Sequence, residues 1–341
     1  MKKLLAIILA IGVAISFAAC VNESGNEENI SSETNQTETQ KPETQETEKA
    51  PEAGPLDLKG GTVAIGDVTL SAEFIKLDIP LTLTSPSKGS MAVDGSTVYL
   101  SNGASLIKKY TLDGDKLTFV KDITVKKAEG VEVGRDGKIY AGGSAVAAKI
   151  YDSEGTEIGD FPESGKLEVA KTADFALTYF PGRDSVKKIV GSEASDWVIS
   201  GLKAADPAER KGPFKSVSAI EIAGEHVMVV GSIETGQSLV VFDMAGNEIV
   251  RGAEKLHGNG IHAMTETANG YMTASVSTIH LTKKDGTYIG HATNTKPLFG
   301  VEDSIWLNEF SPLPDGSVLA GGAVKRSDGV VEFVVYKVKG F

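Results

Sequence analysis

The sequence of 341 residues predicts an all-β fold built from repeated four-stranded units. Residues 130–161 and 261–292 share one order of features: four short apolar segments, separated by turns that contain glycine. Two further copies begin at Met91 and Ala219. Helical periodicity is nearly absent, and only residues 201–212 have the composition of a helical turn. Short apolar segments with glycine turns, recurring at a fixed period, indicate strands in a repeat architecture.

The spacing of the repeats predicts the number of units. Glycines that close the first hairpin of each copy stand at Gly95, Gly137, Gly224, Gly270 and Gly316. Successive gaps are 42, 87, 46 and 46 residues, so the gap of 87 covers two periods. A divergent copy is therefore expected around residues 169–190. Six units of about 44 residues, each with four strands, predict a six-bladed β-propeller of four-stranded blades. The Asp-Gly and Ala-Gly turns supply the positive φ of tight hairpins.

The sequence also predicts how the ring closes. Residues 333–340 match residues 239–246, the end of a third strand and its turn, and the chain then stops. The sixth unit thus lacks a fourth strand, which would leave an unpaired edge. The segment Glu73–Leu83 alternates apolar and charged residues and is expected to close the propeller as an N-terminal strand. The predicted propeller domain spans residues 56–341.

One copy carries a family resemblance. Residues 130–161, GVEVGRDGKIYAGGSAVAAKIYDSEGTEIGDF, resemble an NHL-type repeat, although GGSAVA lacks the Asp and Asn-His usual in the second turn. The resemblance implies the superfamily of six-bladed propellers, NHL-repeat-like or TolB-like. Because one propeller fold hosts many activities, it implies no function.

The N-terminus predicts export. Lys2 and Lys3 precede an uncharged apolar run from Leu4 to Ala19, which is typical of a signal peptide, here residues 1–19. Cys20 follows as the only cysteine, and "FAAC" resembles the lipobox of bacterial lipoproteins. That resemblance implies lipid attachment, including palmitate, at Cys20 and a place on the extracytoplasmic face of the cell membrane. An ordinary secretory signal with an incidental cysteine is the alternative.

The segment that follows is acidic and polar. Residues 20–55 hold nine Glu and two Lys and almost no large apolar side chain, so they are expected to form a disordered tether. The formal charge of the whole chain is −12, and residues 56–341 retain −7 of it. An acidic domain is a poor electrostatic partner for nucleic acid. With Cys20 lipidated, the domain has no thiol for a disulfide or a metal site.

Candidate binding residues come from the loops expected on one face of the propeller. These loops precede the first strand of each unit or join its second and third strands. The candidates are Glu129, Arg183, Asp184, Lys215, His262, Trp306, Asn308 and Glu309. Together they suggest a polar surface for a protein, peptide or glycan ligand from the cell envelope. Trp306 beside Asn308 suits stacking on a sugar or peptide, and packing between blades is the alternative. Solvated loop side chains are the alternative for the other candidates.

Motifs for catalysis are weak. The sequence has no zinc-binding helix, no Gly-x-Ser-x-Gly elbow and no phosphate-binding loop, so no cofactor is predicted. Glu129, Asn308 and Glu309 imitate part of the divalent-metal site of gluconolactonase-like propellers. His262, Arg183 and Asp184 offer a weaker match to quinone-dependent dehydrogenases. Three hypotheses follow: a monomeric, membrane-tethered binding propeller without catalysis, a metal-dependent hydrolase, and a structural member of an envelope complex.

Overall fold

Short strands joined by tight turns make up most of the chain in a computed structural model. The structure describes residues 56, 58–143, 145–197, 214–233, 236–252, 256 and 260–341, within the compact unit Ala53–Phe341. The expected signal peptide, Cys20, the acidic segment and the helical turn at 201–212 lie outside the described residues. Among the described residues, no helix has the length and apolar character to cross a membrane.

Four of the sheets contain four antiparallel strands each, in sequence order. The first contains β7 (Gly130–Val133), β8 (Ile139–Gly143), β9 (Val146–Tyr151) and β10 (Glu157–Asp160). The second contains β11 (Lys166–Val169), β12 (Ala176–Tyr179), β13 (Val186–Val190) and β14 (Glu193–Asp196), where the divergent copy was expected. The third contains β15 (Ser216–Ala223), β16 (His226–Ser232), β17 (Gln237–Asp243) and β18 (Glu248–Arg251). The fourth contains β19 (Ala263–Glu266), β20 (Gly270–Ser275), β21 (Thr278–Lys283) and β22 (Tyr288–Ala292).

A nine-stranded sheet joins the two ends of the folded region. From the N-terminal region it takes β1 (Thr62–Ile65), β2 (Val68–Leu77), β3 (Ser90–Asp94), β4 (Thr97–Ser101), β5 (Leu106–Asp113) and β6 (Lys116–Thr124). From the C-terminal region it takes β23 (Ile305–Pro312), β24 (Val318–Lys325) and β25 (Val331–Lys339). The order is β23-β24-β25-β2-β6-β5-β4-β3, and β1 pairs with β2. Two short helices, η1 (Pro86–Lys88) and α1 (Lys296–Phe299), complete the described elements.

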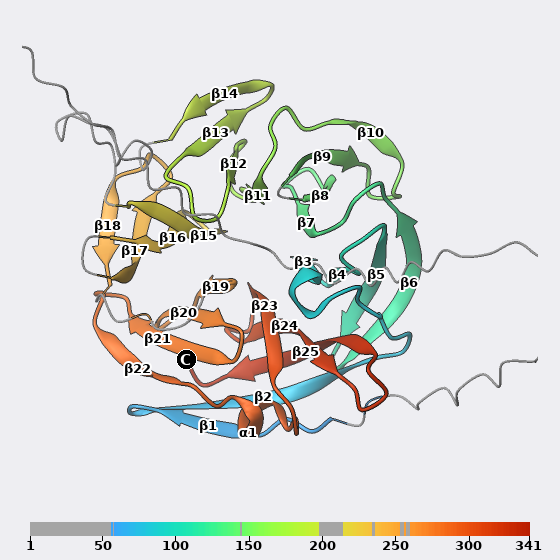
Figure 1. Cartoon of the computed structure of the whole chain (residues 1–341), viewed down its shortest axis with the longest axis vertical. Helices are drawn as coiled ribbons and strands as arrows, with labels where there is room; N and C mark the ends of the chain where they lie inside the picture. Colours follow the sequence, from blue (N-terminus) through green and yellow to red (C-terminus); the bar gives the residue numbers. More distant parts are fainter. Residues whose placement is uncertain are drawn as a thin grey trace, which may run out of the picture. The chain divides into compact units, whose positions relative to one another are not determined.

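The first strands of the repeats form a closed circle. In the described region β3, β7, β11, β15, β19 and β23 contact one another in that order, and β23 contacts β3. Figure 1 shows these strands near the centre, with β6, β10, β14, β18 and β22 at the periphery. Radially arranged antiparallel sheets around a common centre define a β-propeller. The fold class is thus all-β, as the repeats predict.

The N-terminal strand differs from the expected segment Glu73–Leu83. β2 begins earlier, at Val68, because its first residues form a hairpin with β1, and Ser71–Ile75 pair with β25. It ends at Leu77, before Pro80, which has no N–H to donate to a ladder. Beyond this break, Leu83 donates a backbone hydrogen bond to Val331, so the chain meets β25 again. β2 also pairs in parallel with β6 through Lys76 and Leu77, which the repeats do not predict.

Four of the five first-hairpin glycines have the expected backbone. Gly95, Gly137, Gly224 and Gly316 have φ between 59° and 81°. Gly270 differs, because it opens β20 rather than closing a turn. A Cβ at Gly270 would lie 2.1 Å from the carbonyl oxygen of Thr282, so close backbone approach requires glycine there.

The hydrophobic core lies between neighbouring sheets. One cluster joins Leu177 of β12 and Val186 of β13 to Val217 of β15 and Val227 of β16, all fully buried. Peripheral strands are more exposed, as in β14. The inner strands are therefore held on both sides by packed cores, which makes them a firm support for side chains that point to the centre.

Candidate functional site

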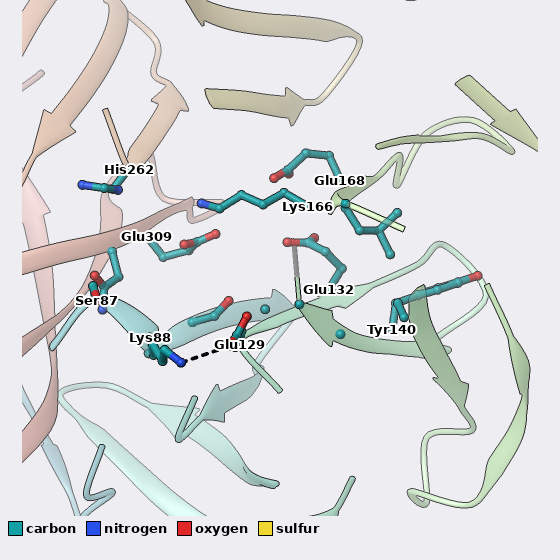
Figure 2. A pocket seen from close by; sticks show the side chains of 18 residues that line it. Ser87, Lys88, Glu129, Glu132, Tyr140, Lys166, Glu168, His262 and Glu309 are labelled. Atoms are coloured by element: carbon teal, nitrogen blue, oxygen red, sulfur yellow. Dashed lines mark hydrogen bonds and ion pairs between the residues drawn. The ribbon is translucent and has the colours of Figure 1, made fainter. Parts of the chain in front are cut away.

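Polar side chains surround a cavity at the starts of the inner strands. This mouth cavity has a volume of about 280 Å³. Its charged and polar lining includes Lys88, Glu129, Glu132, Lys166, Glu168, His262, Asn308 and Glu309. Figure 2 shows the carboxyl groups of Glu132, Glu168 and Glu309 pointing into it from different strands. Four of the eight residues singled out from the sequence thus meet here: Glu129, His262, Asn308 and Glu309.

An ion pair sits at the edge of the mouth cavity. Lys88 Nζ donates a hydrogen bond to Glu129 Oε1 over 3.0 Å (Figure 2). Lys127 Nζ lies 3.5 Å from the same oxygen. Burial acts to raise the pKa of Glu129, but the hydrogen bond from Lys88 and the charges of both lysines outweigh it and lower the pKa. Glu129 is therefore ionised and neutralised by partners within the chain.

Three glutamates form a wall common to two cavities. Glu132, Glu168 and Glu309 line both the mouth cavity and a smaller inner cavity of about 80 Å³, which Glu221 and Lys171 also line. We call Glu132, Glu168 and Glu309 the shared glutamates. Strand alternation explains their direction. Val131 and Val133 on either side of Glu132 are buried in the core, so Glu132 points to the opposite face, toward the centre.

The shared glutamates and Glu221 resist ionisation. Burial raises the pKa of Glu132 to about 7, although Lys171 acts in the opposite direction. Burial, followed by repulsion from neighbouring carboxylates, raises the pKa of Glu168, Glu221 and Glu309 well above the ordinary range. Desolvation and like charges both disfavour the charged carboxylate. Glu132, Glu168 and Glu221 therefore titrate as a coupled set, and burial favours the protonated form of all four groups.

Two lysines flank these glutamates. Lys171 reaches from the end of β11 across to β3, where its Nζ donates a hydrogen bond to the carbonyl oxygen of Val93 over 2.6 Å. Lys166 acts to lower the pKa of Glu168 and Glu309, and Figure 2 shows its side chain extending toward them. Within the described residues, the side chain of Lys166 has no hydrogen bond or ion pair. Two ammonium groups thus face four carboxyl groups.

A β-bulge in β23 positions three sequence-predicted residues. Trp306, Asn308 and Glu309 were expected in a loop before the strand, but they lie within β23, which begins at Ile305. The pairing with β24 shifts between Leu307 and Glu309, so Asn308 is the extra residue of the bulge. A bulge re-aims side chains, and Glu309 consequently faces the cavities. The side-chain amide of Asn308 donates to the carbonyl oxygen of Pro86 over 3.0 Å.

His262 and Trp306 form an aromatic edge. Their ring centroids lie 6.1 Å apart, and His262 lines the mouth cavity. Burial, helped by the charge of Lys166, lowers the pKa of His262, so the ring is neutral at neutral pH. Trp306 packs against a hydrophobic cluster, and its buried Nε1 has no hydrogen-bond partner among the described residues.

Three predicted residues lie away from the mouth cavity. Arg183, Asp184 and Lys215 are not among its lining residues. The loop at Arg183 instead folds against the next sheet, where Val217 donates a backbone hydrogen bond to the Arg183 carbonyl over 2.7 Å. The Arg183 guanidinium stacks 5.2 Å from the ring centre of Phe180. These three residues therefore do not share the mouth cavity with the other candidates, and their role in binding stays a prediction.

The sequence-based candidates include Glu309 but not the other glutamates that line the two cavities. Glu132, Glu168 and Glu221 each lie inside a first strand between apolar residues, in VEV, LEV and IEI. A lone charge flanked by core residues on an inner strand points away from the core, and in a propeller that direction is the centre. This pattern is visible in the sequence, but the candidate residues were taken from loops, and these glutamates lie within strands.

The described residues contain no group of three or more His, Cys, Asp or Glu side chains arranged to hold a metal ion. No protein-family model matches the chain, and no curated protein matches it. Among solved structures, the chain is similar to the WD40 β-propeller domain of Doa1, with 12% identity and a TM-score of 0.48. That similarity covers 81% of this chain and 96% of the other.

Proposed function

We propose that this chain is a bacterial lipoprotein that binds an envelope ligand in its mouth cavity without catalysing a reaction. The signal-like residues 1–19 and "FAAC" favour export and lipid attachment at Cys20. The acidic segment 20–55 then separates the membrane from the propeller. The partner is a protein, peptide or glycan of the cell envelope.

The fold in this proposal is a six-bladed, NHL-like or TolB-like propeller that an N-terminal strand closes. The circle of inner strands and the pairing of β2 with β25 favour it. A ring closed by backbone hydrogen bonds needs no disulfide, which suits an exported domain whose only cysteine is Cys20.

The mouth cavity is the observation that carries the proposal. It combines the Lys88–Glu129 ion pair at its edge with the shared glutamates and with the ammonium of Lys166, which forms no ion pair within the part of the chain that the structure describes. Binding sites are concave and hold a few convergent polar groups and perturbed pKa values. Apolar surface is present too, from Tyr140, Ala148 and Leu167.

Retention from the native envelope tests this proposal. The full chain, purified in detergent and immobilised, is incubated with solubilised envelope, and a matched sample carries Glu129→Gln. The control is Glu154→Gln, because Glu154 also pairs with a lysine, Lys121, but on an exposed outer turn. We expect a specific molecule that the unchanged chain and Glu154→Gln retain and that Glu129→Gln loses. Equal retention by all three samples contradicts binding at the mouth cavity.

A metal-dependent hydrolase of the gluconolactonase-like kind is the second candidate. It would use Glu129, Asn308 and Glu309 as part of a divalent-metal site. In the structure, Glu129 pairs with Lys88 and Lys127, and Asn308 is hydrogen-bonded to the backbone of Pro86. These partners favour a binding role over metal ligation. One divalent ion per chain, lost on substitution of Glu129, would support the hydrolase instead.

A further inference from the structure

We propose that the shared glutamates bind an organic cation, an alkylammonium or guanidinium group, that enters through the mouth cavity. This inference rests on the proposed function, because it takes the mouth cavity as the ligand site, and it names the ligand's chemistry. The head of the cation would lie against Glu168, with Glu132 and Glu309 beside it.

The side chain of Glu168 is the one that most favours a bound cation. The residue is only 9% exposed, and it lines both cavities. Within the described residues it has no hydrogen bond and no ion pair. Its carboxyl oxygens are not among the fully enclosed atoms that lack a partner, so they open to the two cavities, where a ligand could supply the missing partner. Glu168 therefore differs from Glu129, whose charge Lys88 and Lys127 already neutralise.

A bound cation can replace protons that the carboxyl groups around Glu168 tend to hold when the cavities are empty. Four carboxyl groups face the inner cavity or its wall, and Lys166 and Lys171 supply two positive charges. Lys171 Nζ donates a hydrogen bond to the Val93 carbonyl oxygen, which holds one of these two positive charges beside β3. If all four carboxyl groups were ionised, two negative charges would remain. With one of the four carboxyl groups protonated and one monovalent cation bound, the charges of the carboxyl groups, the two lysines and the cation sum to zero.

The shape and lining of the mouth cavity favour an organic cation over a metal ion. Tyr140, Ala148 and Leu167 line the mouth cavity with the shared glutamates and offer apolar contact for a methylene stem. A metal ion needs several oxygen ligands at about 2.0–2.6 Å, whereas an ammonium or guanidinium group accepts longer, hydrogen-bonded contacts. The described residues form no metal-holding group of three. The nearby Lys166 ammonium would also repel a divalent ion more strongly than a monovalent head.

Binding of such a cation should depend on pH. Protonated carboxyl groups attract a cation weakly, so ionisation of the shared glutamates strengthens binding as pH rises. The titratable groups that face Glu168 or lie near it are Glu132, Glu221, Glu309, Lys166, Lys171, His262, Tyr140 and Tyr179. His262, with its lowered pKa, stays neutral at neutral pH. Glu132, with a pKa of about 7, is the group whose change falls in the accessible range.

Isothermal titration calorimetry on the full chain in detergent tests the inference. The probes are acetyl-Gly-Lys-Gly-amide, its norleucine analogue and 1,5-diaminopentane, each at about pH 6 and about pH 8. We expect the lysine peptide or the diamine to bind, the norleucine peptide not to bind, and affinity to rise by up to about tenfold for each pH unit per proton released. If the lysine peptide binds more tightly than the diamine, the natural cation belongs to a protein or peptide. If the diamine binds more tightly, the natural cation is a free amine.

Matched variants locate the site. Glu168→Gln should weaken binding by about tenfold or more, as loss of a buried charge-assisted contact does. Glu154→Gln should change nothing, and Lys166→Ala should tighten binding because a competing ammonium is removed. If Glu168→Gln fails to fold, as a thermal melt would show, the amine affinity of Lys166→Ala alone tests the site: tighter binding supports it, and unchanged binding contradicts it.

Three outcomes would overturn the inference: no binding of either amine, equal binding by Glu168→Gln, or stoichiometric Ca²⁺ binding that Glu168→Gln abolishes. The envelope-retention assay separates this failure from failure of the proposed function. An envelope ligand that still depends on Glu129, together with absent amine binding, leaves the binding role and removes only the cation. Absence of both removes the mouth cavity as a site.

Discussion

Phe74 of β2 lies opposite Tyr336 of β25, with ring centroids 5.4 Å apart, so the beginning and end of the folded region share one sheet. The Tyr336 ring also packs 4.8 Å from Phe299, and its hydroxyl donates a hydrogen bond to the Phe299 carbonyl oxygen over 2.7 Å. β2 thus covers the edge of β25 with backbone hydrogen bonds and aromatic contact. Two predictions follow from this contact.

A chain that begins at Ser85 should lose its closure. Without β2, the edge of β25 is open, and its sequence "VEFVVYKV" is strongly β-prone and rich in apolar residues. We expect aggregation and a loss comparable to a domain's whole stability margin of about 5–15 kcal/mol. A chain that begins at Leu56 keeps β1 and β2 and should melt like the full protein. Size-exclusion chromatography and thermal melts of the two chains provide the measurement, and identical behaviour would contradict closure by β2.

Phe74→Ala should weaken the same contact without removing β2. Phe74 is half-buried, so we expect the free energy of unfolding to fall by about 2 kcal/mol, below the cost at a fully buried site. Val120→Ala on β6 is the control, because Val120 is 49% exposed and its change should stay within about 0.5 kcal/mol. Urea unfolding measures both variants. A Phe74→Ala value no larger than the control would mean that the aromatic contact contributes nothing to closure.

Glu168→Gln should change how stability depends on pH. The folded protein raises the pKa of Glu168 above its unfolded value, so the group's stabilising contribution is full below the unfolded pKa. That contribution is lost as pH rises through the folded pKa. The same sign holds for Glu132, whose window runs from about 4.3 in the unfolded chain to its folded pKa of about 7.

Thermal melts at about pH 5 and about pH 8 test this sign. At the higher pH, Glu168→Gln should melt above the unchanged protein by a few degrees, since about 1 kcal/mol shifts Tm by about 2–4 °C in larger domains. At the lower pH the difference should shrink. Glu154→Gln, at an exposed ion pair, should show no such trend. A variant that is destabilised at the higher pH would contradict the assignment of Glu168 as a strained, unpartnered carboxyl group.

Cys20→Ser should release the protein from the membrane without unfolding the propeller. Each buried CH₂ of an acyl chain contributes about 0.8 kcal/mol to anchoring, so removal of the lipid removes the anchor. Cell fractionation by immunoblot measures the change, and a melt of the purified variant checks the fold. A variant that stays in the membrane fraction would contradict lipid attachment at Cys20.

The repeats predicted much of the fold because tight hairpin turns can be recognised from glycines at regular positions in the sequence. Glycine spacing located the sheets, including the divergent one around β12, since tight turns require positive φ at fixed positions. The bounds of β2 and its parallel pairing with β6 were missed, because they depend on partners far along the chain. Such contacts leave no local pattern.

The candidate site was predicted in part for a similar reason. Glu129 and His262 lie beside inner strands, as the loop argument placed them, and they line the mouth cavity. Arg183 does not line this cavity, because the direction of its loop depends on the neighbouring sheet against which it packs, which the loop's own sequence does not encode. Glu132 and Glu168 were not among the candidates, although the alternation of side chains along a strand predicts that both point away from the core. The sequence therefore contained the signal that identifies them.

Site-specific photo-cross-linking in the native envelope tests the central claim, that the mouth cavity is where this protein binds its ligand. Ser87 is exposed and lines the cavity, so a photoreactive phenylalanine derivative in its place reaches a bound molecule. The same derivative at Glu154, on an exposed outer turn, is the matched control. We predict a discrete adduct at position 87 that is absent at 154 and is reduced by Glu129→Gln. Adducts of equal yield at both positions, or none at position 87, would contradict the claim.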